Sequence, residues 1–159
     1  MIRTENLTPH QMQNWLLQGR LFYSQSSYLS NNWPRQRQSQ FIESIMLGIP
    51  LAPIFVSENW QGHYILLDGL NRVKSILGFI DGGYQLNKLS ILKDYNKRFF
   101  KDLPYYMQNK LAYCKLDICI IPVNTDQSVV ASVLKRVNYP NTSIHKEQVI
   151  DVLNTFQKK

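Results

Sequence analysis

The chain has 159 residues, of which 44% are hydrophobic, and it carries 18 Lys and Arg against 11 Asp and Glu, a formal charge of +7. This length suits one domain with a core of its own, and the composition is that of a globular protein rather than a disordered one. The positive charge favours anionic partners, such as nucleotides, nucleic acids or acidic proteins.

Several classes of protein are disfavoured. No run of about 18 apolar residues is present, so no membrane-spanning helix is expected. The start, MIRTENLTPHQMQNW, lacks the apolar segment of a secretory signal, which favours a cytoplasmic protein. Cys114 and Cys119 would face opposite sides of one strand, which disfavours a disulfide. Together with three scattered histidines they form no zinc-binding spacing.

The first third of the chain predicts two helices. Thr8 followed by Pro9 indicates a helix start, and this helix should end near Gly19. Residues 22–34 are rich in Ser and Asn and are expected to be irregular. A second helix, with apolar residues at helical spacing, should end at residues 48–50.

The middle of the chain predicts a hairpin followed by a helix. Residues 53–57 and 63–67 are short apolar runs of strand type, and the ENWQG sequence between them favours a turn. A helix follows at once over residues 70–80 and ends at residues 81–83. Residues 84–103 are mixed in character, with a cationic run.

The rest of the chain predicts a strand and three helices. Pro104 opens a short helix, and residues 116–123 form the third strand. Helices are expected over residues 127–137 and 145–156. The expected fold is therefore a single α+β domain over residues 1–159, with about three strands and four or five helices.

The most informative segment joins the strand at residues 63–67 to the helix at residues 70–80. The first amides of a helix attract anions, Gly69 allows a close approach to the backbone, and Arg72 offers donors suited to phosphate. Asp68 could hold a divalent cation that bridges phosphates.

A purely structural interpretation is available for each of these residues. Asp68 could cap the helix, Gly69 could serve only the turn, and Arg72 could be solvated or pair with Asp68 or Glu43. Because strand–turn–helix junctions with Asp-Gly are common, the residues alone favour this structural interpretation.

The runs FIESIMLGIPLAPIFV and YILLDGLNRVKSILGFI resemble the amino-terminal domain of GmrSD-type type IV restriction enzymes, which belongs to the ParB/sulfiredoxin-like group. A later run, LKRVNYPNTSIHKEQVI, is similar to another segment of that family. The resemblance covers about residues 33–150. The matching positions are Trp33, Ile42 to Ser44, Gly48 to Pro50, Asp68, Gly69, Arg72, Arg136, Asn138 and Glu147.

The resemblance implies a ParB/sulfiredoxin-like fold that binds a nucleoside triphosphate with Mg²⁺, and that could hydrolyse it, in defence against foreign DNA or in its evasion. Asp68 and the amides of Gly69 and Leu70 would hold the metal and the phosphates. Arg72 would neutralise them, and Asn71 would contact phosphate or ribose. Arg136 and Asn138 would close the site from the later segment.

The chain departs from the family pattern at three places. Leu70 and Asn71 replace two glutamines, and no Gln-Arg pair stands near residues 28–30. Losing that arginine removes a phosphate contact, so binding could survive where hydrolysis does not. Arg35 and Arg37 lie close to Trp33 and are candidates to replace it.

Other activities are less well supported. The cysteine that sulfiredoxins carry in this turn is absent, and the histidines form no nuclease pattern. Cleavage of nucleic acid by this chain alone is therefore not expected, and a separate nuclease or defence protein is the expected partner. If the chain is an enzyme, the expected activity is that of a nucleoside triphosphatase.

An alternative is an inactive DNA-binding or protein-interaction module that uses a basic surface. Its candidate residues are Arg35, Arg37, Lys97 and Arg98. The aromatic residues at positions 95, 99 and 100 are expected to belong to the core. The sequence does not determine the oligomeric state.

Overall fold

The computed structural model describes residues 1–23, 32–137, 153, 154 and 156, and it shows an α+β fold. The strands are β1 (Arg3–Leu7), β2 (Leu21–Tyr23), β3 (Ile54–Glu58), β4 (Tyr64–Asp68) and β5 (Leu116–Ile121). The helices are α1 (Pro9–Leu17), α2 (Arg35–Leu47), α3 (Leu70–Ile80), α4 (Tyr105–Ala112) and α5 (Gln127–Val137), with 3₁₀ turns η1 (Lys93–Tyr95) and η2 (Phe100–Asp102).

The strands form one mixed sheet in the order β1-β5-β3-β4-β2. β3 pairs antiparallel with β4 and parallel with β5, which confirms the three predicted strands as the centre of the sheet. The expected number of strands was too low, because β1 and β2 were missed. Both are edge strands: the first four residues of β1 are exposed, and β2 has only three residues. Edge strands need no continuous apolar run, so their sequence signal is weak.

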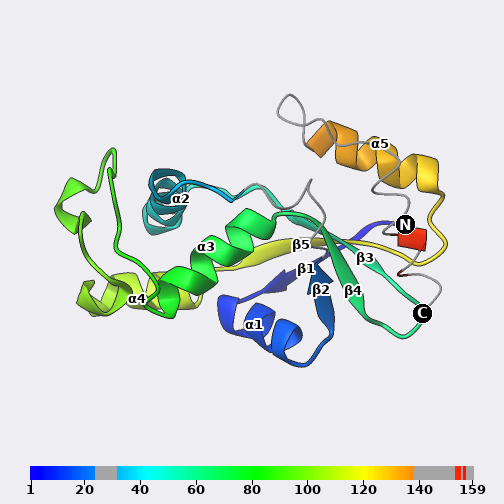
Figure 1. The fold of residues 1–159 in the computed structure, drawn as a ribbon, viewed down its shortest axis with the longest axis horizontal. Helices are drawn as coiled ribbons and strands as arrows, with labels where there is room; N and C mark the ends of the chain where they lie inside the picture. Colours follow the sequence, from blue (N-terminus) through cyan, green and yellow to red (C-terminus); the bar gives the residue numbers. More distant parts are fainter. Residues whose placement is uncertain (24–31, 138–152, 155, 157–159) are drawn as a thin grey trace.

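Helices cover both faces of the sheet (Figure 1). On one face, Val56 and Leu66 belong to a core shared with α1, α2, α3 and α4. On the other face, Ile65 and Leu67 pack with Val130 of α5. β4 therefore serves both cores, because successive side chains of a strand point to opposite faces. Its fully apolar sequence follows from this position.

The predicted helix boundaries follow from local signals. Thr8 caps α1 in a reciprocal box with Gln11, and Gly48 ends α2 in the left-handed conformation. α4 begins directly after Pro104, as expected. Most of the helix expected over residues 145–156 lies outside the described residues. In the described part of the chain, no helix is long and apolar enough to cross a membrane.

The segment between α3 and α4 is held against α2 by Glu43. This side chain is 4% exposed, and its carboxylate accepts hydrogen bonds from the amides of Ser90 (3.1 Å), Ile91 (2.7 Å) and Leu92 (2.7 Å). Burial alone would raise the pKa of Glu43, but the three backbone donors hold it below its usual value. The carboxylate therefore has a structural role.

Candidate functional site

The junction between β4 and α3 brings the backbone very close to β3. Gly69 has φ +102°, a conformation that L side chains rarely adopt. A Cβ atom added there would lie 2.9 Å from Cγ1 of Ile54, which is buried. Glycine is therefore required at this position for two reasons, backbone conformation and space.

Asp68 and Arg72 form an ion pair across this junction. Nη2 of Arg72 donates to Oδ2 of Asp68, and Nη1 donates to the carbonyl oxygen of Ala52 (3.0 Å). The side chain of Asp68 is 19% exposed, and that of Arg72 is 13% exposed. Of the partners considered for Arg72, Asp68 is the one that the structure shows, whereas Glu43 binds backbone amides. Arg72 therefore fixes the orientation of Asp68 and ties α3 to the segment before β3.

The segment that precedes α2 contacts the first turn of α3. The amide of Trp33 donates to Oδ1 of Asn71 (3.0 Å), and the guanidinium of Arg37 lies 4.6 Å from the centre of the Trp33 ring. Lys74 donates to Oδ1 of Asn32 (3.3 Å). These contacts place Trp33 and Arg37 beside the first turn of α3, and the replacement of the missing arginine by Arg37 stays a prediction.

Lys74 was not among the site residues predicted from the sequence, although its helical spacing from Asn71 indicates it. It lies three residues after Asn71 on α3, so the two share one side of the helix. Lys74 and Arg37 are both exposed cations, and Nζ of Lys74 lies 5.8 Å from the centre of the Tyr23 ring. The rim of the junction is therefore positive and partly aromatic.

The remaining candidate residues lie elsewhere or outside the described residues. Arg35 stacks on Tyr84, 4.1 Å from the ring centre, rather than on Trp33. Arg136 is exposed in the last turn of α5, and no hydrogen bond or ion pair within the described residues joins it to the junction. Asn138 and Glu147 are outside the described residues. Lys97 and Arg98 are exposed between η1 and η2, in the segment that follows the far end of α3 in the chain.

The junction could hold a metal ion only if a bound ligand supplied most of the coordinating atoms. Among the described residues, no group of three or more His, Cys, Asp or Glu side chains could hold a metal ion. Asp68 is a single carboxylate, and one of its oxygens is already engaged by Arg72. This donor set suits Mg²⁺ that receives most of its ligands from phosphates and water, which is common for nucleotide-bound Mg²⁺.

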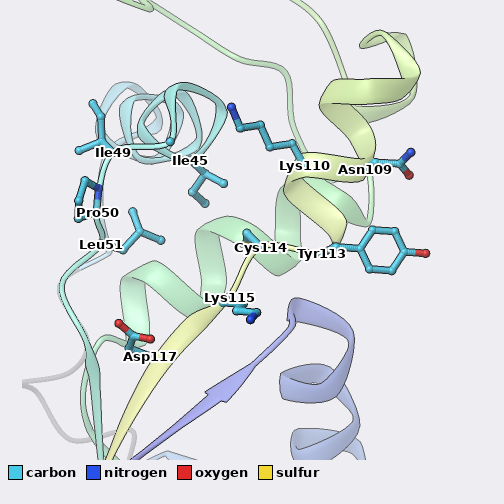
Figure 2. A pocket seen from close by; sticks show the side chains of 11 residues that line it. Ile45, Ile49, Pro50, Leu51, Asn109, Lys110, Tyr113, Cys114, Lys115 and Asp117 are labelled. Carbon is cyan, nitrogen blue, oxygen red and sulfur yellow. The ribbon is translucent and has the colours of Figure 1, made fainter.

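A separate groove of about 470 Å³ lies between the ends of α2 and α4 and the start of β5 (Figure 2). Its walls include Ile49, Leu51 and Lys110, and Cys114 lies at its base. Burial raises the pKa of the Cys114 thiol to about 11, so this thiol is a poor nucleophile at neutral pH. None of the predicted site residues lines this groove.

The fold and the junction define a small α+β domain in which a strand, an Asp-Gly turn and a helix form one polar corner. Residues 30–158 match the family model of the GmrSD restriction endonuclease, N-terminal domain. The match covers most of the chain, so the chain belongs to this family, and the resemblance is confirmed. No curated protein matches the chain.

Proposed function

We propose that this protein is a nucleotide-binding domain of a restriction-type defence system, and that the junction between β4 and α3 holds the phosphates. The main support is the ion pair of Asp68 and Arg72 at a strand–Asp-Gly–helix junction, in a chain that belongs to the GmrSD N-terminal domain family. Within the described residues, no side-chain cap is present at the start of α3, and the dipole of the helix favours an anion at this end.

The surrounding residues have distinct roles in this proposal. The amides of Gly69 and Leu70 donate to phosphate oxygens, and Lys74 and Arg37 neutralise charge at the rim. The second oxygen of Asp68 would hold Mg²⁺, and the ion would reduce the negative charge of the phosphates. Arg72 acts as a positioning residue, because its guanidinium is bound to Asp68 and Ala52.

The proposal is one of binding, and hydrolysis is a separate question for the same protein. A triphosphatase needs a group that orients the attacking water. Glu43, the buried carboxylate of α2, is engaged by three backbone amides, so it does not supply that group. DNA cleavage would then depend on a nuclease partner.

The decisive experiment is a thermal-shift panel with ATP, GTP, CTP and UTP, each with and without Mg²⁺. A nucleotide at 100 times its Kd should stabilise the protein by about 2.7 kcal/mol. Lys74→Ala should weaken binding about 5- to 30-fold, because a charge-assisted contact of about 1–2 kcal/mol is lost. Lys74 is exposed, so the unliganded Tm should stay unchanged.

Lys135→Ala is the matched control, because this exposed lysine lies on α5 at the other face of the sheet. It should bind nucleotide like the wild type. Arg72→Ala is less suitable, since it leaves Asp68 largely buried without its partner and lowers stability by itself. The absence of a shift with every nucleotide would refute the proposal.

A further inference from the structure

The positive charge of the protein is concentrated in one segment. Residues 86–115 contain seven Lys and Arg and only two Asp and Glu, so these 30 residues hold +5 of the total formal charge of +7. All seven cations are exposed. Within the described residues none of them forms an ion pair, because the ion pairs found there involve Arg3 and Arg72.

Exposed aromatic side chains lie in the same segment. Tyr105, Tyr106 and Tyr113 of α4 and its C-cap are 78%, 61% and 72% exposed. The three tyrosines lie on the side of α4 opposite the buried Leu111, whereas Lys110 lies on the side that faces the end of α2 (Figure 2). We call these cations and tyrosines the basic surface. Its members are Lys88, Lys93, Lys97, Arg98, Lys101, Tyr105, Tyr106, Lys110, Tyr113 and Lys115.

Hydrogen bonds hold the parts of this surface in place. The backbone of Leu86 pairs with those of Lys97 (2.8 Å) and Arg98 (3.0 Å), and the hydroxyls of Tyr95 and Tyr106 lie 3.2 Å apart. The segment forms the end of the molecule that lies furthest from the β3–β4 hairpin (Figure 1). The basic surface is therefore a prearranged part of the fold.

Two of its lysines occupy unfavourable backbone conformations. Lys88 has φ +51° and Lys97 has φ +63°, and Asn124 is the only other non-glycine residue with positive φ in the described part of the chain. Glycine or asparagine is favoured in this conformation. A lysine in this conformation makes the folded protein less stable than a glycine would, which is consistent with a functional use of its charge.

We propose that the basic surface binds single-stranded nucleic acid, with its cations on the phosphates and its tyrosines stacked on unpaired bases. Interleaved cations and exposed rings are the arrangement that single strands require. A protein partner fits less well, because protein interfaces are depleted in lysine. A duplex also fits less well, because its base faces are not accessible to the tyrosines.

The test is fluorescence anisotropy with a labelled 20-nucleotide oligo-dT over a range of salt concentrations. The logarithm of affinity should fall with the logarithm of salt by about 0.7 per phosphate contact, or about 3 for four contacts. Lys97→Gly removes one charge and relieves a positive φ, so it should reduce this slope by about 0.7 without loss of stability. Lys135→Ala should leave the slope unchanged.

Tyr105→Ala should weaken binding about 5- to 100-fold, the range found for base-stacking rings. Trp60→Ala is the matched control, because Trp60 is 69% exposed at the β3–β4 turn, far from the basic surface. The proposal would be overturned if a duplex bound as tightly as oligo-dT, or if polyglutamate competed as well as unlabelled oligo-dT. Equal effects of Tyr105→Ala and Trp60→Ala would also overturn it. Nucleotide binding at the junction should be unaffected by Lys97→Gly, so the two proposals fail independently.

Discussion

Replacing Glu43 by glutamine tests the structural role of the buried carboxylate that holds the segment after α3 against α2. Oε1 accepts from the amides of Ile91 and Leu92, and Oε2 accepts from that of Ser90. Glutamine has nearly the same shape but carries no charge. Its amide nitrogen would face one of these donors, so at least one hydrogen bond is lost.

The expected cost follows from these three contacts. A hydrogen bond to a charged group contributes about 1.5–3 kcal/mol, against about 0.5–1.5 kcal/mol for a neutral pair. Two bonds weakened by about 1 kcal/mol each and one lost entirely give about 3.5–5 kcal/mol. The whole stability of a domain is about 5–15 kcal/mol, so the loss is large but leaves a measurable folded state.

The cost should also depend on pH. The folded protein holds the pKa of Glu43 below its usual value of 4.5, so the folded state binds the proton more weakly than the unfolded state. The stabilisation is therefore complete above the unfolded pKa and is lost as the pH falls through the folded pKa. Glu43→Gln cannot titrate at this position. The difference in the free energy of unfolding between the wild type and Glu43→Gln should therefore become smaller as the pH falls.

Urea unfolding of the wild type and Glu43→Gln at pH 7 and pH 3 provides the measurement. Glu5→Gln is the control, because Glu5 is exposed and lies 3.6 Å from Arg3 in a surface ion pair. It should change the free energy of unfolding by less than about 1 kcal/mol. This account would be refuted if Glu43→Gln lowered the free energy of unfolding by less than about 1 kcal/mol, or by the same amount at both pH values.

Two further predictions concern local structure. Gly69→Ala should lower the free energy of unfolding by about 2–5 kcal/mol, because it combines positive φ with a clash against Ile54. Gly62 has φ +75° but no atom within 4 Å of an added Cβ, so Gly62→Ala should cost only about 1–2 kcal/mol. Equal losses in chemical denaturation would show that the close approach to β3 has no energetic role. Thr8→Ala should cost about 0.5–2 kcal/mol, measured in the same way, because it removes the cap of α1. No change would contradict the role of that cap.

The sequence by itself determined the local features of this protein. The Thr8-Pro9 start of α1, the glycine end of α2 and the periodic apolar residues of α3 are local signals, and each predicted its helix. The three central strands were predictable because burial on both faces requires apolar runs. The motifs that carry the family resemblance also lie within short segments, and the family match confirms that resemblance.

Only the tertiary structure decided which of these residues meet. β1 was missed because its polar sequence becomes a strand only by pairing with β5, and its first residue, Arg3, pairs with Ile120, 117 residues further along the chain. Arg72 could have paired with Asp68 or Glu43, and α2 and the segment after α3 determine that Glu43 binds amides instead. Arg35 and Arg37 are two residues apart, yet one stacks on Tyr84 and the other on Trp33. The physical reason is the same in each case: a polar side chain has several possible partners of similar energy, and packing determines which of them lies within reach.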